Sequence, residues 1–218
     1  MRTYVVIGLG RFGTAVATEL CRLGHEVLAI DDSEDRVQSI SSQVTHAVAG
    51  DARDPGVLRA LGVRNYNCAI VAGADDVGNS ALITMNLKEL GVRQVIAKAQ
   101  SHVHQKVLQK IGADRVVFPE HEMGVKLAQN LSSSNILNFI ELSDDFGIVE
   151  LATPKPWVGK SLSTLDVRAK YRVNIIAIRK GGDEHDLEVA PGADYVLAAG
   201  DVVVTLGRNE YIDRLHDL

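Results

Sequence analysis

The sequence predicts an α/β protein, with a doubly wound parallel sheet followed by a second, smaller α+β domain. From residue 4 to about 118, short β-branched runs alternate with longer amphipathic segments, as in a parallel sheet covered by helices. Beyond that region, strands mix with short helices. The chain has 218 residues, enough for two domains, which we place at residues 1–132 and 137–218.

Six strands are expected in the first domain, at residues 4–8, 26–30, 45–49, 68–72, 94–98 and 115–118. Five helices alternate with them, near residues 12–22, 34–41, 55–60, 76–90 and 102–111. In each helical stretch apolar residues recur three and four positions apart, which is the spacing of one helix face. Glycine follows four of these stretches, where a left-handed residue ends a helix at no steric cost.

The second domain is expected after a helix at residues 120–131 and a polar linker, Ser132-Ser133-Ser134-Asn135. Its pattern predicts strands and extended segments with two short helices. The extended segments lie at residues 136–142, 148–152, 173–179, 195–197 and 202–206, and a turn lies at 181–183. The helices lie at residues 163–170 and from about 209 onward.

The composition excludes several classes of protein. Lys and Arg total 23 against 28 Asp and Glu, a net charge of -5, so no general basic field would attract nucleic acid. No apolar run approaches the ~18 residues of a membrane-spanning helix, and no leader is visible. We therefore expect a cytoplasmic protein. Cys21 and Cys68 lie in apolar runs and are expected to be buried thiols rather than a disulfide.

A glycine-rich motif joins the first strand to the first helix. Gly8, Gly10 and Gly13 form the pattern G-x-G-x-x-G, and Arg11 and Phe12 lie inside it. The first glycine allows a tight turn, the second lets the backbone approach a phosphate, and the third lets helix and strand pack closely. The glycines could instead serve packing alone. The strand and helix around them favour a Rossmann-like dinucleotide or nucleotide site.

Acidic residues follow the second and third strands. Asp31 comes 18 positions after Gly13, where a carboxylate accepts hydrogen bonds from ribose hydroxyls, and Asp32 follows it. Two carboxylates there would repel a 2′-phosphate, which disfavours NADP. Asp51 and Ala52 end the third strand, where an adenine ring would lie, although a surface turn is an equal alternative.

Arg11 opposes the dipole at the helix start, which indicates either a phosphate partner or a solvated side chain. No arrangement of nucleophile and base, and no acid/base group for a dehydrogenase, can be identified. His102 and His104 lie two positions apart near a helix start, on different faces, and we expect both to be exposed. The sequence describes a binding protein better than an enzyme, with an NAD(H)-dependent redox enzyme or sensor as the alternative.

The motif at residues 6–13 belongs to an ordered set of short runs. The others lie at residues 45–48, 61–66, 87–91, 98–100, 110–114, 118–120, 142–144, 149–151, 166–171 and 199–201. Together they resemble the KtrA/TrkA-type cytosolic regulatory subunits of bacterial potassium uptake, which carry RCK (KTN) domains. The resemblance covers nearly the whole chain.

This resemblance implies a nucleotide-gated subunit whose dimers assemble into an octameric ring beneath a membrane potassium-translocating subunit. ATP and ADP are the implied ligands, with NAD or NADH as an alternative. Arg11 would reach a neighbouring subunit's γ-phosphate, Asp31 would hold ribose, and Lys98 would be a further nucleotide-binding residue. Glu120 would be associated with a divalent cation, Mg²⁺ or Ca²⁺.

For the second domain, the resemblance implies binding of cyclic di-AMP at a dimer interface, with Arg168 and Asn174 as the family's Arg and Asn. On the residues alone, Arg168 could equally pair with Asp166 or Glu150, and Asn174 could cap a turn. The chain departs from the family at two places. The loop at residues 74–80 differs from the usual run, and Arg172 replaces a common Gly after Tyr171.

Overall fold

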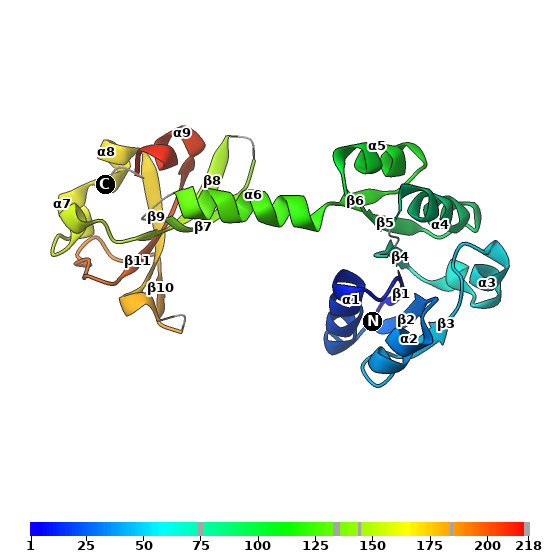
Figure 1. The fold of residues 1–218 in the computed structure, drawn as a ribbon. Coiled ribbons are helices and arrows are strands. Elements are labelled where there is room, and N and C mark those ends of the chain that lie inside the picture. Colours follow the sequence, from blue (N-terminus) through cyan, green and yellow to red (C-terminus); the bar gives the residue numbers. More distant parts are fainter. Residues whose placement is uncertain (74–75, 133–135, 144, 184, 216–218) are drawn as a thin grey trace. The chain divides into compact units, whose positions relative to one another are not determined.

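The computed structural model describes all residues except 74–75, 133–135, 144, 184 and 216–218 (Figure 1). The described chain divides into two compact units, Met1–His121 and Glu122–Leu218. This division falls inside the helix α6 (Pro119–Ser132), earlier than the linker that the sequence favours. Ser132 closes that helix, and the rest of the expected linker lies outside the described residues.

The first unit contains six parallel strands in the order β3-β2-β1-β4-β5-β6. They are β1 (Thr3–Ile7), β2 (Glu26–Asp31), β3 (His46–Ala49), β4 (Cys68–Val71), β5 (Gln94–Lys98) and β6 (Arg115–Val117). Every strand agrees with its predicted range to within one residue at each end, so the doubly wound fold is confirmed. The strand order reverses between β1 and β4, and ligands of such sheets bind at the carboxyl ends beside that reversal.

Five helices cover the two faces of this sheet (Figure 1). They are α1 (Arg11–Arg22), α2 (Glu34–Ile40), α3 (Pro55–Ala60), α4 (Val77–Glu89) and α5 (His102–Lys110), and a 3₁₀ turn spans Val63–Asn65. Ala17 of α1 and Ile40 of α2 pack in one apolar cluster. Leu58, Leu87 and Leu108 of the other three helices pack in a second cluster. Alternate residues of the strands enter the two clusters, because successive side chains point to opposite faces.

The second unit is built on an antiparallel sheet in the order β10-β9-β11-β8-β7. Its strands are β7 (Ile136–Glu141), β8 (Phe146–Ala152), β9 (Val173–Arg179), β10 (Leu187–Val189) and β11 (Val202–Arg208). Besides the part of α6 from Glu122 onward, its helices are α7 (Leu162–Leu165), α8 (Val167–Tyr171) and α9 (Asn209–Ile212). Short 3₁₀ turns lie at Lys155–Trp157, Lys180–Gly182 and Asp213–Leu215. The expected smaller α+β fold is therefore confirmed.

Three details of the second unit differ from the sequence prediction. The helix expected at 163–170 is broken at Asp166, whose φ of 44° places it in the left-handed region and separates α7 from α8. The extended segment at 195–197 forms only an isolated bridge between Ser161 and Val196. The strand β10 was not predicted, because only three residues pair, and only with β9.

Both cysteines are free thiols, as expected. Cys68 is buried, and burial raises the pKa of its thiol to about 11. Cys21 is only partly buried, which corrects the expectation for that residue, and its Sγ lies 3.7 Å from Thr45 Oγ1. Among the described residues, no helix is long and apolar enough to cross a membrane.

Candidate functional site

The three glycines of the motif have different surroundings. Gly8 has φ of 91°, and a Cβ there would lie 2.3 Å from the backbone of Gly73 in the loop after β4. A Cβ at Gly13 would lie 1.8 Å from the carbonyl oxygen of Gly8. A Cβ at Gly10 would meet no atom within 4 Å. The fold itself therefore requires Gly8 and Gly13, whereas the space above Gly10 is open.

The first turn of α1 is open in a second respect. The helices α2, α3, α4 and α5 each begin with a Ser or Asp side chain that accepts a backbone N–H, but Gly10 gives α1 no such cap. The first turn of α1 also lacks an acidic residue. Uncapped N–H groups and the positive end of the helix dipole attract an anion. These features fit a phosphate group.

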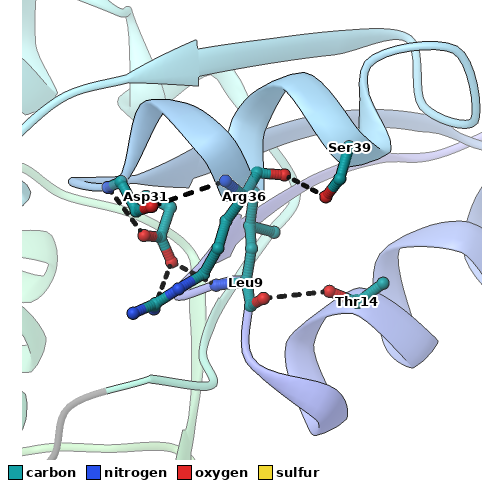
Figure 2. Close-up of polar contacts among 6 residues, drawn as sticks. Leu9, Thr14, Asp31, Arg36 and Ser39 are labelled. Atoms are coloured by element: carbon teal, nitrogen blue, oxygen red, sulfur yellow. Dashed lines mark hydrogen bonds and ion pairs between the residues drawn. The ribbon is translucent and has the colours of Figure 1, made fainter.

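Asp31 lies at the carboxyl end of β2, only 4% exposed, and Figure 2 shows what converges on it. Its Oδ2 accepts a hydrogen bond from the backbone N–H of Leu9, inside the motif, at 2.6 Å. Its Oδ1 accepts from the N–H of Ser33 at 2.9 Å. The carboxylate is thus fixed beside the glycine loop, where the ribose of a nucleotide bound at that loop would lie.

Asp31 also forms an ion pair with Arg36, a residue whose role the sequence pattern did not reveal (Figure 2). One guanidinium nitrogen, Nη1, lies 3.3 Å from Asp31 Oδ2, and the Arg36 side chain is 53% exposed. The pair has a single, long contact and its Arg36 partner is largely exposed to water, so the ion pair is weak and a ribose hydroxyl can displace it. Asp32 is also exposed. The signal that could have revealed Arg36 is a cation in the first turn of the helix that follows Asp31.

Asp51 lies just beyond β3 and is bound by Arg53, another residue that the sequence analysis missed. Both carboxylate oxygens accept from the Arg53 guanidinium at 2.8 Å. This hydrogen bonding holds the pKa of Asp51 below its ordinary value. Asn86 of α4 donates to the Arg53 carbonyl at 2.9 Å, and Ala52 is buried. The loop is therefore an ordered turn, and Asp51 is 46% exposed at its surface.

Four residues expected to bind nucleotide or a cation, Arg11, Phe12, Lys98 and Glu120, come together at α1, β5 and α6. Lys98 Nζ lies 2.5 Å from Glu120 Oε1 and 5.7 Å from the centroid of the Phe12 ring. The hydrogen bond from Lys98 holds the pKa of Glu120 below its ordinary value, and the field of Arg11 adds to this effect. Arg11 is exposed in the first turn of α1. Two cations and one carboxylate thus lie near the first turn of α1.

The arrangement around Glu120 does not form a complete metal centre. In the part of the chain that the structure describes, no group of three or more His, Cys, Asp or Glu side chains could hold a metal ion. Glu120 is 62% exposed and already paired with Lys98. A single carboxylate fits a divalent cation only when phosphate oxygens supply further ligands, as Mg²⁺ prefers.

Arg168 and Asn174 belong to the second unit. Both are exposed, Arg168 on α8 and Asn174 near the start of β9. The alternative partner Glu150 is engaged by Arg179 at 3.2 Å, and within the described residues Arg168 makes no ion pair. Arg172, where the family has a common Gly, has φ of 56° and donates to the Tyr211 hydroxyl at 2.9 Å. The loop departure lies at residues 74–80, of which 74–75 lie outside the described residues.

His102 is exposed as expected, but the expectation for His104 is wrong. His104 is fully buried between α4 and α5, and its Nε2 lies 2.5 Å from Ser80 Oγ. The sequence pattern did not reveal this contact because the Ser80 partner lies 24 positions away.

The chain matches two protein-family models, the TrkA-N domain at residues 4–119 and the TrkA-C domain at residues 147–218. It is 44% identical to Ktr system potassium uptake protein A of Bacillus subtilis (strain 168), over 99% of this chain and 96% of that protein. It is 41% identical to Ktr system potassium uptake protein C of the same organism, over 98% and 95%.

Solved structures give the same fold. The GsuK RCK domain superposes with a TM-score of 0.69 at 20% identity, over 100% of this chain and 47% of that one. A GsuK channel bound to NAD superposes with a TM-score of 0.67 at 20% identity, over 98% and 38%. The family models and the nearly full-length relatives together show that this chain belongs to the TrkA-N/TrkA-C family of RCK proteins that includes the Ktr potassium uptake proteins.

Proposed function

We propose that the first unit binds an adenine nucleotide and that the chain regulates a membrane potassium-transport system through it. The uncapped, open start of α1 above Gly10 carries this proposal. Around it lie a carboxylate for ribose, Asp31, and the cations Arg11 and Lys98 for phosphate. The relatives' role in potassium uptake supports the regulatory half of the proposal.

The proposed ligands are ATP and ADP. Their phosphates would accept from the N–H groups at the start of α1, and Asp31 would accept from the ribose hydroxyls. The adenine would lie beside Asp51 and Ala52, at the carboxyl end of β3. NADP is disfavoured, because its 2′-phosphate would come beside Asp31 and Asp32. Arg36 offsets part of that repulsion but holds Asp31 through only one contact.

Calorimetry with ATP, ADP and NADP tests this assignment. ATP and ADP should bind, and NADP should bind more weakly than ADP. Replacing Asp31 by Ala should weaken ADP binding by about tenfold to 150-fold, because charge-assisted hydrogen bonds to the ribose are lost. Asp35→Ala, which removes an exposed carboxylate from α2, is the matched control and should leave ADP affinity unchanged. Tighter binding of NADP than of ADP would refute the assignment.

NAD or NADH is the second candidate ligand. A GsuK channel that shares this fold is described as bound to NAD, and another GsuK structure, 28% identical over 60% of this chain with a TM-score of 0.51, as bound to ADP. We propose a binding role rather than redox turnover, so NADH oxidation should not accompany binding. Competition between NAD and ADP in the same titration would rank the two ligands.

We further propose that the chain works in the cytoplasm, peripheral to the membrane, on a potassium-translocating subunit. Dimers would assemble into an octameric ring, and ATP and ADP would favour different conformations of it. A ligand shifts a conformation only when it binds the two states with different affinity. Light scattering should therefore show assemblies of four to eight chains, and small-angle scattering should differ between ATP and ADP. A monomer at micromolar concentration would contradict this arrangement.

A further inference from the structure

His104 makes a complete set of hydrogen bonds although it is fully buried. Its Nδ1 accepts from the backbone N–H of Gln100 at 3.3 Å. Its Nε2 lies 2.5 Å from Ser80 Oγ, and that hydroxyl donates to the carbonyl of Val77 at 3.2 Å. Since Nδ1 accepts and the Ser80 proton is used elsewhere, the imidazole is neutral with its proton on Nε2.

These contacts connect the β5–α5 loop to the start of α4, at the carboxyl ends of the sheet. Gln100 lies two residues beyond Lys98, in the loop from β5 to α5. Ser80 lies in the first turn of α4, after the loop that follows β4. His104 therefore ties the segment that carries Lys98 to the first turn of α4.

A second proton cannot enter this arrangement without breaking it. A proton on Nδ1 would point at the N–H of Gln100, so a hydrogen bond would become a repulsion between two donors. Burial of His104 lowers the pKa of its imidazole, and the nearby carboxylate of Asp76 offsets only part of this effect. Ser80 and the Gln100 amide, its other contacts on α4 and the β5–α5 loop, are neutral, and Lys98 is turned to Glu120.

We propose that His104 is a positioning residue that holds the β5–α5 loop, which follows Lys98, against the first turn of α4 in the geometry that binds nucleotide, and that it releases this loop when it is protonated. The proposal deepens the nucleotide-binding role proposed above and rests on it. The neutral form of His104 prevails above the ordinary histidine pKa of about 6.5, so its hydrogen bonds are intact there. These hydrogen bonds are lost as the pH falls below that value and through the lowered pKa of His104 in the folded state.

The test measures ADP and NAD affinity by calorimetry from about pH 7.5 to about pH 5, a range that spans the ordinary histidine pKa. NAD has no phosphate that titrates in this range, so its profile reports on the protein. In the natural chain, affinity should fall about fivefold to tenfold, the worth of about one net hydrogen bond. His104→Gln, whose amide can donate to Ser80 but does not titrate, should bind near the natural affinity at the higher pH and show no such fall.

His46→Gln is the matched control, because His46 is exposed at the amino end of β3, away from the site. It should keep the natural pH profile. A His104→Gln protein with the natural profile would overturn the proposal.

Nitrogen NMR of the natural chain supplies a test that needs no variant. It should show the Nε2–H tautomer of His104, a pKa below the ordinary value, and shifts of the Gln100 and Ser80 amides on the same titration. An Nδ1–H tautomer, or a titration that leaves both amides unmoved, would overturn the proposal. This NMR experiment needs no ligand, so it tests the role of His104 independently of nucleotide binding. Failure of the natural chain to bind any nucleotide at the higher pH would instead refute the proposed function.

Discussion

The two units place left-handed backbone on different residues. In the first unit, every described residue with positive φ is a glycine, at positions 8, 24, 62, 91 and 112. In the second unit, three non-glycine residues adopt positive φ: Asp166, Arg172 and Ala190. A left-handed residue with a Cβ costs about 1–2 kcal/mol, so the second unit carries backbone strain that the first avoids.

The same difference explains where the sequence was informative. Glycines mark the helix ends and the nucleotide loop of the first unit, and its strands could be placed to within a residue. The left-handed Asp166 leaves no such mark, so the break between α7 and α8 could not be foreseen. Backbone requirements are visible in a sequence when glycine meets them, and hidden when another residue does.

The largest expected effect separates a glycine required by the fold from one required by the ligand. Gly13→Ala should lower the free energy of unfolding by about 3 kcal/mol or more, because the new Cβ would clash with the Gly8 carbonyl. Gly10→Ala should change it by about 1 kcal/mol or less, since the space is open. Gly10→Ala should nevertheless weaken ADP binding by about tenfold or more. Chemical denaturation and calorimetry measure both quantities.

Equal destabilisation by the two substitutions would show that Gly10 also serves packing. Undiminished ADP affinity in a folded Gly10→Ala protein would show that the phosphate lies elsewhere.

The next effect concerns the second unit, where we propose a cyclic di-AMP site at a dimer interface. Arg168 is exposed and has no carboxylate partner among the described residues, so it is free to bind phosphate. Arg168→Ala should weaken cyclic di-AMP binding by about 2–3 kcal/mol, because symmetry removes two contacts at once. Lys170→Ala, a neighbouring exposed cation on α8, is the control.

Titration of the full chain with cyclic di-AMP should give one ligand per two chains. A folded dimer that shows no heat of binding would leave the second unit with an assembly role alone.

Glu120→Gln should separate cation binding from nucleotide binding. If Glu120 completes a Mg²⁺ or Ca²⁺ site together with ATP phosphates, the Glu120→Gln protein should no longer bind ATP more tightly when the cation is added. Its ADP affinity should stay nearly intact. Calorimetry with and without the cation measures this. Glu122→Gln, in the same helix turn, is the control. Loss of ADP affinity as well would indicate that Glu120 acts through its ion pair with Lys98, by ordering the end of β5, and not by binding a cation.

The site was predictable only in part. The glycine motif and Asp31 could be identified because their spacing reflects one strand–turn–helix unit. Arg36, Arg53 and the buried His104 could not, because their roles depend on contacts that the motif does not specify. Asp51 was placed correctly at the end of β3, but its pairing with Arg53 follows from the turn geometry.

The smallest expected effect tests the strain in the second unit. Ala190→Gly should raise the free energy of unfolding by about 1 kcal/mol, because glycine accepts the positive φ without steric cost. Arg172→Gly should raise it less, since it also removes the hydrogen bond to Tyr211. Denaturant titration compares the two variants. A larger gain from Arg172→Gly than from Ala190→Gly would mean that the Tyr211 contact contributes nothing.

Hydrogen exchange with and without ADP tests the central claim most directly, because it examines the two units together. Bound ADP should slow exchange of the amides at residues 8–14, at the start of α1, and leave the amides of β9 and α8 in the second unit unchanged. Slower exchange confined to the second unit, or no change at residues 8–14 at saturating ADP, would contradict it.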